Sequence, residues 1–177
     1  LDLGYPGGPV IDRIAKTGNP AAVKFPRSLL KGQSLDFSFS GLKTAVLYHV
    51  NGVPGENRRK QGKPERAKRG IESFTEQEIA DIAASFQAAV VDVLRIKLRR
   101  AAEATGAKTL IIGGGVSANS ALRAAGQKLA DRSHRTLRLA ELRFCVDNAG
   151  MIAGLGWHYL QAGKVADLDL AACATVH

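Results

Sequence analysis

The sequence predicts an α/β fold in which strands alternate with helices, and three patterns support this class. Residues 109–112 form a short apolar run with β-branched side chains, which is typical of a buried parallel strand. Residues 79–98 carry apolar side chains at helical spacing. Residues 135–142 largely alternate between apolar and polar side chains, so we expect them to include a second strand. Alternating helices and strands of this kind form layered α/β domains.

The 177-residue chain is long enough for one domain with a hydrophobic core. Its composition is ordinary for a soluble globular protein, and no apolar run approaches the roughly 18 residues of a membrane span. The first residues do not resemble a signal peptide. The single methionine is Met151, so we expect a processed chain or part of a longer protein. We expect a cytoplasmic location, because Cys145 and Cys173 have neither metal-binding spacing nor a disulfide framework.

The net charge of +9 favours a polyanionic partner such as RNA. Residues 51–70 carry seven cations, two anions and no aromatic residue, and so contribute +5. Two compatible interpretations stay open, a solvated mobile loop and a surface that contacts phosphates. We therefore expect one domain over residues 1–163, with 51–70 as a basic mobile loop, followed by a tail over 164–177.

A turn-rich loop at residues 4–9 precedes apolar residues at helical spacing over 10–15. We expect Asp12 to lie in the first turn of this helix. One interpretation is a carboxylate that complements the helix dipole, and the other is a group that hydrogen-bonds a sugar hydroxyl or orients a substrate.

Residues 35–40 alternate and predict a strand with Leu35, Phe37 and Phe39 on one face, and residues 42–50 predict a helix. Ser38 and Ser40 have no histidine or acid placed by the sequence to activate them. They therefore fit strand-edge or capping roles better than a nucleophile role.

A long helix is predicted to start after Thr75 and to end near Gly106. Residues 75–78 form a capping box, and glycine is the favoured residue just beyond a helix C-terminus. The apolar stripe between them favours a core helix. We expect its outer face to be basic, with Arg95, Lys97, Arg99 and Arg100.

Three glycines at 113–115 end the strand at 109–112, and Ser117 or Asn119 can cap the helix that follows. A strand, a glycine turn and a helix N-terminus together offer backbone N–H groups to an anion. The pattern is neither a Walker A loop nor a dinucleotide-binding fingerprint. An ordinary strand-to-helix turn remains an equal alternative.

Asp147 ends a short apolar stretch just before a predicted helix that includes residues 151–157. In α/β folds an acid at such a junction, on the edge that holds the glycine loops, handles metal or phosphate. The alternative interpretation is an aspartate that caps the helix.

Four motifs occur in the order known from one family: GYPGGP at 4–9, DFSFSGLKT at 36–44, GGVSANSALR at 114–123 and FCVDNAGMIA at 144–153. From Leu3 to about Gly163, the chain closely resembles the C-terminal half of the tRNA threonylcarbamoyladenosine transferase family (TsaD/Gcp, formerly described as O-sialoglycoprotein endopeptidase). The resemblance implies an actin-like, sugar-kinase-like (ASKHA) ATPase fold built from two related α/β halves.

The resemblance also implies a reaction and a site. A threonylcarbamoyl group would pass from its adenylate to the exocyclic amine of the adenosine beside the anticodon of tRNA. Gly8, Asp12 and Asn119 match substrate-binding positions, and Asp147 matches the single carboxylate ligand of a divalent metal, iron or zinc. The implied partners are tRNA and TsaB- and TsaE-like companion proteins. No residue is assigned as catalytic, because no general base is evident.

Several family features lie outside this sequence: two metal-binding histidines, a Ser-Gly-Gly phosphate loop and a further substrate-binding aspartate. The usual Asp-Asn-Gly also reads Asp147-Asn148-Ala149 here. Because one ligand of three cannot hold a metal tightly, we expect the chain alone to be inactive and without a tightly bound metal. Exposed apolar surface could pair two copies in a homodimer, and we expect no membrane contact.

Two other function classes stay open. A kinase or ATPase of the same fold would phosphorylate a small molecule, and a non-catalytic interaction domain would bind a partner without using Asn119 or Asp147. A protease is disfavoured, because the sequence has no metalloprotease motif and no nucleophile with a placed base.

Overall fold

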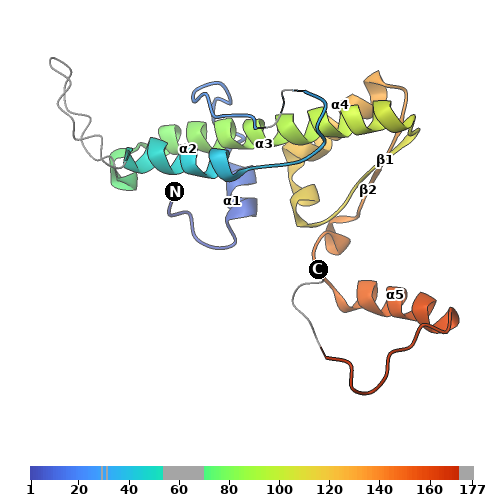
Figure 1. Cartoon of the computed structure of the whole chain (residues 1–177). Coiled ribbons are helices and arrows are strands. Elements are labelled where there is room, and N and C mark those ends of the chain that lie inside the picture. The colour runs from blue at the N-terminus through green and yellow to red at the C-terminus, as the bar shows by residue number, and fades with distance from the viewer. Residues whose placement is uncertain (29, 31, 54–69, 172–177) are drawn as a thin grey trace, which may run out of the picture.

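The computed structural model describes residues 1–28, 30, 32–53 and 70–171. Within these ranges it contains five α-helices and one parallel two-stranded sheet, so the predicted α/β class is confirmed (Figure 1). Short 3-10 turns lie at Ile71–Ser73, Gly115–Ala118 and Leu142–Phe144. In chain order the helices and strands are α1 Gly7–Ile14, α2 Ser40–Asn51, α3 Glu76–Thr105, β1 Thr109–Ile112, α4 Ser120–Arg132, β2 Thr136–Leu139 and α5 Ala149–Gln161.

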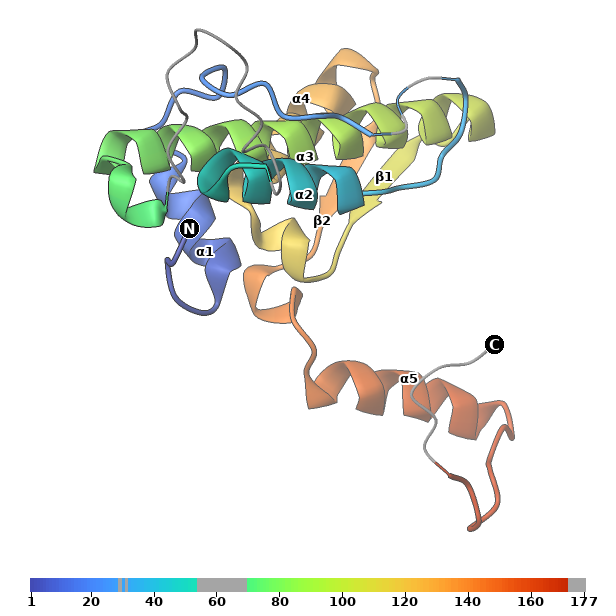
Figure 2. The same ribbon diagram turned by 60° about the vertical axis from the view of Figure 1, so that its left-hand side comes forward.

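Helix α3 is the axis of the fold, and α1, α2 and α4 lie against it (Figures 1 and 2). Its limits are set by the predicted caps. Thr75 accepts a hydrogen bond from the backbone N–H of Glu78, whose carboxylate accepts one from the backbone N–H of Thr75. At the other end Gly106 has φ 65°, the left-handed conformation that glycine adopts without strain.

Three apolar clusters of the described residues lie along α3, and the smallest joins Ala15, just after α1, to Ala83 and Ala84. Another cluster joins Phe25 of the loop before α2 and Leu42 of α2 to Ile82 and Ala89 of α3. The third lies under the sheet and comprises Ala102, Leu110, Leu129 and Ala130. Burial of such side chains is the main stabilising contribution to folding.

The sheet pairs β1 and β2 in parallel, with Thr109 opposite Thr136 and Ile112 opposite Leu139. Helix α4 connects the two strands, which gives the β-α-β order expected for parallel pairing. Only one face is covered: Leu110 is 3% exposed, but Ile111 on the opposite face is 75% exposed. The predicted parallel strand is confirmed, whereas the expectation that it is buried holds for one face only among the described residues.

The prediction of a strand at 35–40 is wrong. Residues 35–39 form neither helix nor strand, Ser40 already belongs to α2, and Phe37 is 53% exposed. Phe37 and Phe39 instead stack on each other with ring centroids 6.4 Å apart. Alternation produces a strand only where a neighbouring strand is available to pair with it.

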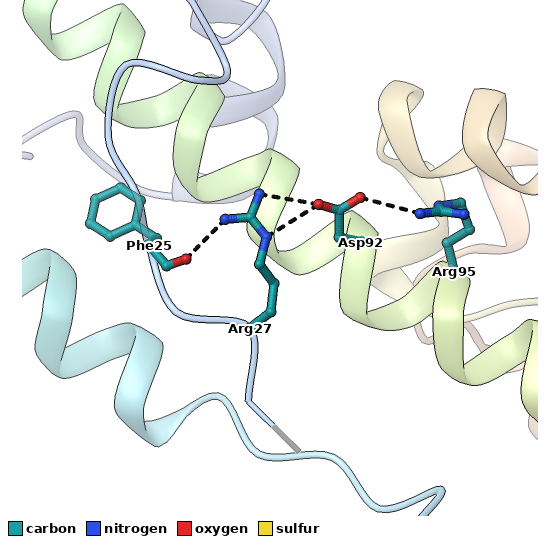
Figure 3. A network of polar contacts seen from close by, with 4 residues as sticks. All are labelled: Phe25, Arg27, Asp92 and Arg95. Carbon is teal, nitrogen blue, oxygen red and sulfur yellow. Dashed lines mark hydrogen bonds and ion pairs between the residues drawn. The ribbon is translucent and has the colours of Figure 1, made fainter. Parts of the chain in front are cut away.

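The basic outer face predicted for α3 is wrong at Lys97, which is 1% exposed. Its ammonium group donates to the carbonyl of Ser34 at 2.6 Å. Two further basic residues, Arg95 of α3 and Arg27 of the loop before α2, share one carboxylate partner. Asp92 accepts from Arg27 at 3.1 Å and pairs with Arg95 at 3.6 Å (Figure 3).

Helix α5 stands apart from the rest of the fold, and none of its residues is buried (Figures 1 and 2). No helix within the described ranges is long and apolar enough to cross a membrane. Residues 164–171 are exposed and form neither helix nor strand. The rest of the predicted tail, 172–177, and residues 54–69 of the predicted basic loop lie outside the described residues, and the proposed division of the chain stays a prediction.

The loop after α1 is fixed to α3 by close backbone contact. A Cβ on Gly18 would overlap the carbonyl group of Ala80. The next residue, Asn19, donates its backbone N–H to Asp81 at 2.7 Å. This bond, aided by a second from Gln77, lowers the pKa of Asp81 below its usual 3.8. The contact therefore sets where α1 lies on α3.

Gly18→Ala should lower the free energy of unfolding by about 1–3 kcal/mol, as expected where a side chain is forced into filled space. Chemical denaturation monitored by circular dichroism measures this. Gly154→Ala is the matched control, because its Cβ would meet nothing within 4 Å in α5. Equal denaturation midpoints for the two variants would contradict the close contact at Gly18.

Candidate functional site

The glycine turn connects β1 to α4 and leaves open space beside its backbone. Gly114 has φ 83°, which other residues rarely adopt, and a Cβ on Gly113 or Gly114 would meet nothing within 4 Å. After the turn, Asn119 caps α4, because its Oδ1 accepts from the backbone N–H of Leu122 at 2.9 Å. Of the two predicted caps the structure uses Asn119, while Ser117 is 1% exposed inside the turn.

Asp12 contacts this same helix N-terminus from α1. Its carboxylate accepts from the backbone N–H of Ser120 at 3.1 and 3.2 Å and from the Ser120 hydroxyl at 2.8 Å. The expectation that Asp12 lies in the first turn of its own helix is wrong, because α1 already begins at Gly7. The carboxylate instead complements the positive end of α4. The fold thus brings two predicted site residues, Asp12 and Asn119, to neighbouring positions.

A third helix reaches the same point through Gln87 of α3. The Nδ2 group of Asn119 donates to Oε1 of Gln87 at 2.6 Å. Asn119 therefore already uses its acceptor oxygen for the cap and one of its two amide hydrogens for Gln87. Within the part of the chain that the structure describes, the second amide hydrogen has no partner and is available to a ligand. Sequence reasoning missed Gln87 and Ser120 as members of this cluster.

Gly8 lies on the exposed first turn of α1, where a Cβ would meet nothing within 4 Å. The loop before it borders a surface hollow of about 550 Å³. Mostly apolar side chains from three helices line the rest of this hollow. They include Ile11 of α1, Val46 of α2 and Phe86 of α3.

Asp147 is exposed and lies beyond the turn Leu142–Phe144, not at the end of a strand. The cap of α5 is Asn148, which accepts from the backbone N–H of Met151 at 3.0 Å, so the N-cap interpretation of Asp147 is wrong. Among the described residues, nothing forms a hydrogen bond or ion pair with the Asp147 carboxylate, so none links it to Asp12 or Asn119.

The residues around Asp147 do not make a metal site by themselves. The described ranges contain no group of three or more histidine, cysteine, aspartate or glutamate side chains able to hold a metal ion. Protein metal sites of the catalytic type use about three such ligands. Asp147 can supply one, so the described residues do not fit a complete iron or zinc site.

Comparison with known proteins gives one consistent result. Residues 1–154 match the family model TsaD, described as tRNA N6-adenosine threonylcarbamoyltransferase. Proteins of that name from Trichlorobacter lovleyi and Clostridioides difficile are 48% and 42% identical, over 99% and 97% of this chain. A third protein of that name, from Thermosipho africanus, is 41% identical over 97% of this chain. In each case the match covers 46% of the relative, so the chain spans about half the length of the curated relatives it matches.

Proposed function

Because the chain belongs to the TsaD family of tRNA N6-adenosine threonylcarbamoyltransferases, we propose that it forms part of a threonylcarbamoyl-transfer site. The donor is threonylcarbamoyl-AMP, and the acceptor is the exocyclic amine of the adenosine next to the anticodon of tRNA. The family resemblance predicted from the four motifs is confirmed. The fold we infer for the whole protein is the ASKHA fold, and the β1-α4-β2 unit is consistent with it.

The observation that carries this proposal is the cluster at the N-terminus of α4. The backbone N–H groups of Ser120 and Leu122 at this terminus already donate to Asp12 and Asn119, so we propose that the backbone N–H groups of the preceding glycine turn contact the phosphate of the adenylate. The glycine turn beside this terminus has open space where side chains would otherwise stand. Asn119 retains one amide hydrogen for the nucleotide, while Asp12 orders Ser120. Gly8 and the neighbouring hollow are the proposed contacts for the rest of the adenylate.

The chemistry is acyl transfer from a mixed anhydride. The adenosine amine attacks the carbamoyl carbon, the bond to the phosphate oxygen breaks, AMP leaves, and the amine loses a proton. Because AMP is a good leaving group, positioning and charge stabilisation can supply most of the catalysis. The groups on this chain bind and orient the adenylate. Asp147 would supply one carboxylate ligand to a metal, and the remaining ligands would have to come from outside the described residues.

Partners and location follow from the proposed reaction. tRNA is the acceptor, TsaB- and TsaE-like proteins are the proposed companions, and the cytoplasm is where the tRNA is found. The cations at 58–69 that we expect to attract tRNA lie outside the described residues, so their role stays a prediction.

Nucleoside mass spectrometry of tRNA tests the proposal. The chain is assayed alone and in a chimera, in which it replaces the matched 46% of the Trichlorobacter lovleyi relative. Unmodified tRNA is incubated with ATP, threonine, bicarbonate and the companion enzymes. We expect threonylcarbamoyladenosine from the chimera and none from the chain alone. A folded chimera that makes no product, beside an active parent enzyme, would overturn the proposed function.

A further inference from the structure

We propose that Arg123 is a positioning residue that fixes the glycine turn and the segment leading to Asp147 relative to each other. This inference rests on the proposed function, because both regions carry proposed site residues. Arg123 lies in the first turn of α4, and its guanidinium group bonds to both regions. Its Nε donates to the carbonyl of Ser117 at 2.7 Å, and its Nη2 donates to the carbonyl of Ala140 at 2.6 Å.

A buried thiol completes this connection. Nη2 of Arg123 also lies 3.3 Å from the sulfur of Cys145, which is 3% exposed. The hydroxyl of Ser117 donates to the same sulfur at 3.1 Å. The thiol in turn lies 3.4 Å from the carbonyl of Glu141. One guanidinium and one thiol therefore join the glycine turn to residues 140–145, which run from the end of β2 to the start of the link to α5.

Two proposed site residues stand close to this connection along the chain. Asn119 is two residues after Ser117, and Asp147 is two residues after Cys145. No described contact joins Asn119 to Asp147 directly, so Arg123 and Cys145 are the observed route by which the position of one depends on the other. Displacements of about 1 Å at a reacting centre can lower rates by about 100-fold.

The geometry requires arginine. Its planar fork directs several N–H donors at fixed angles, so one side chain can hold carbonyls from two segments. Lysine keeps the charge but presents a single ammonium group on a flexible stem, and it cannot reproduce both bonds. The carbonyls of Ser117 and Ala140 would then lose their arginine donor, and the two segments would separate more readily.

Cys145 provides a direct readout in the 177-residue chain. In a Cys173→Ser background it is the remaining thiol, and its rate of reaction with N-ethylmaleimide under native conditions reports how tightly the segments are joined. We expect Arg123→Lys to raise this rate roughly tenfold, because loss of the arginine hydrogen bonds makes local opening around the thiol more frequent. Arg123→Gln serves as the second variant if the lysine variant does not fold.

Arg135 offers a matched control. Its guanidinium also bonds to two carbonyls, those of Ala107 at 2.8 Å and Ala102 at 3.5 Å, but it contacts neither the glycine turn nor Cys145. Arg135→Lys should leave the labelling rate of Cys145 unchanged. Equal labelling rates for the Arg123 and Arg135 variants would overturn the proposal.

The transfer assay distinguishes positioning from simple loss of folded protein. In the chimera we expect Arg123→Lys to raise KM for threonylcarbamoyl-AMP roughly tenfold, because the adenylate-binding turn moves. A smaller folded fraction would lower apparent kcat alone, and an unchanged KM would overturn the proposal. If the chimera makes no product at all, the proposed function fails, and the labelling comparison in the chain still decides the role of Arg123.

Discussion

Asp147→Asn in the chimera should lower the rate of threonylcarbamoyl transfer at least about 100-fold and leave the unfolding midpoint unchanged. Removal of an outer-shell partner of a metal ligand typically costs about 10- to 100-fold, and loss of a ligand itself should cost more. Stability should not change, because the carboxylate is exposed and makes no bond to the described residues, and such surface changes stay within about 0.5 kcal/mol. Nucleoside mass spectrometry and thermal unfolding measure the two effects.

Glu141→Gln is the control for this prediction. Glu141 is an exposed carboxylate in the same segment, and its ion pair with Arg143 lies at the surface, where such pairs contribute little. The Glu141→Gln variant should retain both the transfer rate and the unfolding midpoint. If Asp147→Asn transferred at the rate of Glu141→Gln, Asp147 would not be a metal ligand. Purified Asp147→Asn should also contain less metal than purified Glu141→Gln.

Features set by neighbouring residues in the sequence were predicted well. The capping box at Thr75, the C-cap at Gly106 and the cap at Asn119 all depend on hydrogen bonds or backbone angles within one turn of a helix. The strands at 109–112 and 136–139 followed from short apolar or alternating runs. The family followed from four motifs in order, which is a far more specific signal than any one of them.

Features set by tertiary partners were missed. The segment 35–40 has a strand pattern but no strand to pair with among the described residues. Lys97 has the sequence context of a surface cation, but in the fold its ammonium group is buried and donates to the carbonyl of Ser34. Asp12 was expected in the first turn of its own helix, whereas it contacts the N-terminus of α4, 108 residues further along the chain. A single sequence contains no direct record of such distant pairs.

One signal for the missed contacts was present in the sequence of α3. Four polar residues interrupt the otherwise apolar stretch 79–94 of α3, and each contacts a segment packed against the helix. Ser85, for example, accepts from the backbone N–H of Val23 at 3.1 Å and donates to the carbonyl of Asn19 at 3.2 Å. Polar groups within a packed helix must have partners, so they mark where other segments dock. The four are Asp81, Ser85, Gln87 and Asp92.

Asn119→Ala should lower both stability and activity. The loss of the α4 cap should cost about 1 kcal/mol of unfolding free energy, and Gln87 loses its partner as well. In the chimera, transfer should fall roughly 100-fold, comparable to the loss of one hydrogen-bond donor that stabilises charge at a reacting group. Denaturant unfolding and nucleoside mass spectrometry measure the two effects on the same preparations.

The stability effect alone cannot account for that loss of transfer, and two variants separate the contributions. Thr75→Ala removes the cap of α3, so it should cost a similar free energy of unfolding and leave transfer unchanged. Asn119→Asp keeps an oxygen that can accept from Leu122 but places a negative charge beside Asp12 and the proposed phosphate position. Asn119→Asp should therefore fold normally but transfer poorly. Full activity in Asn119→Asp would mean that Asn119 only caps α4, and that the adenylate is bound by other residues.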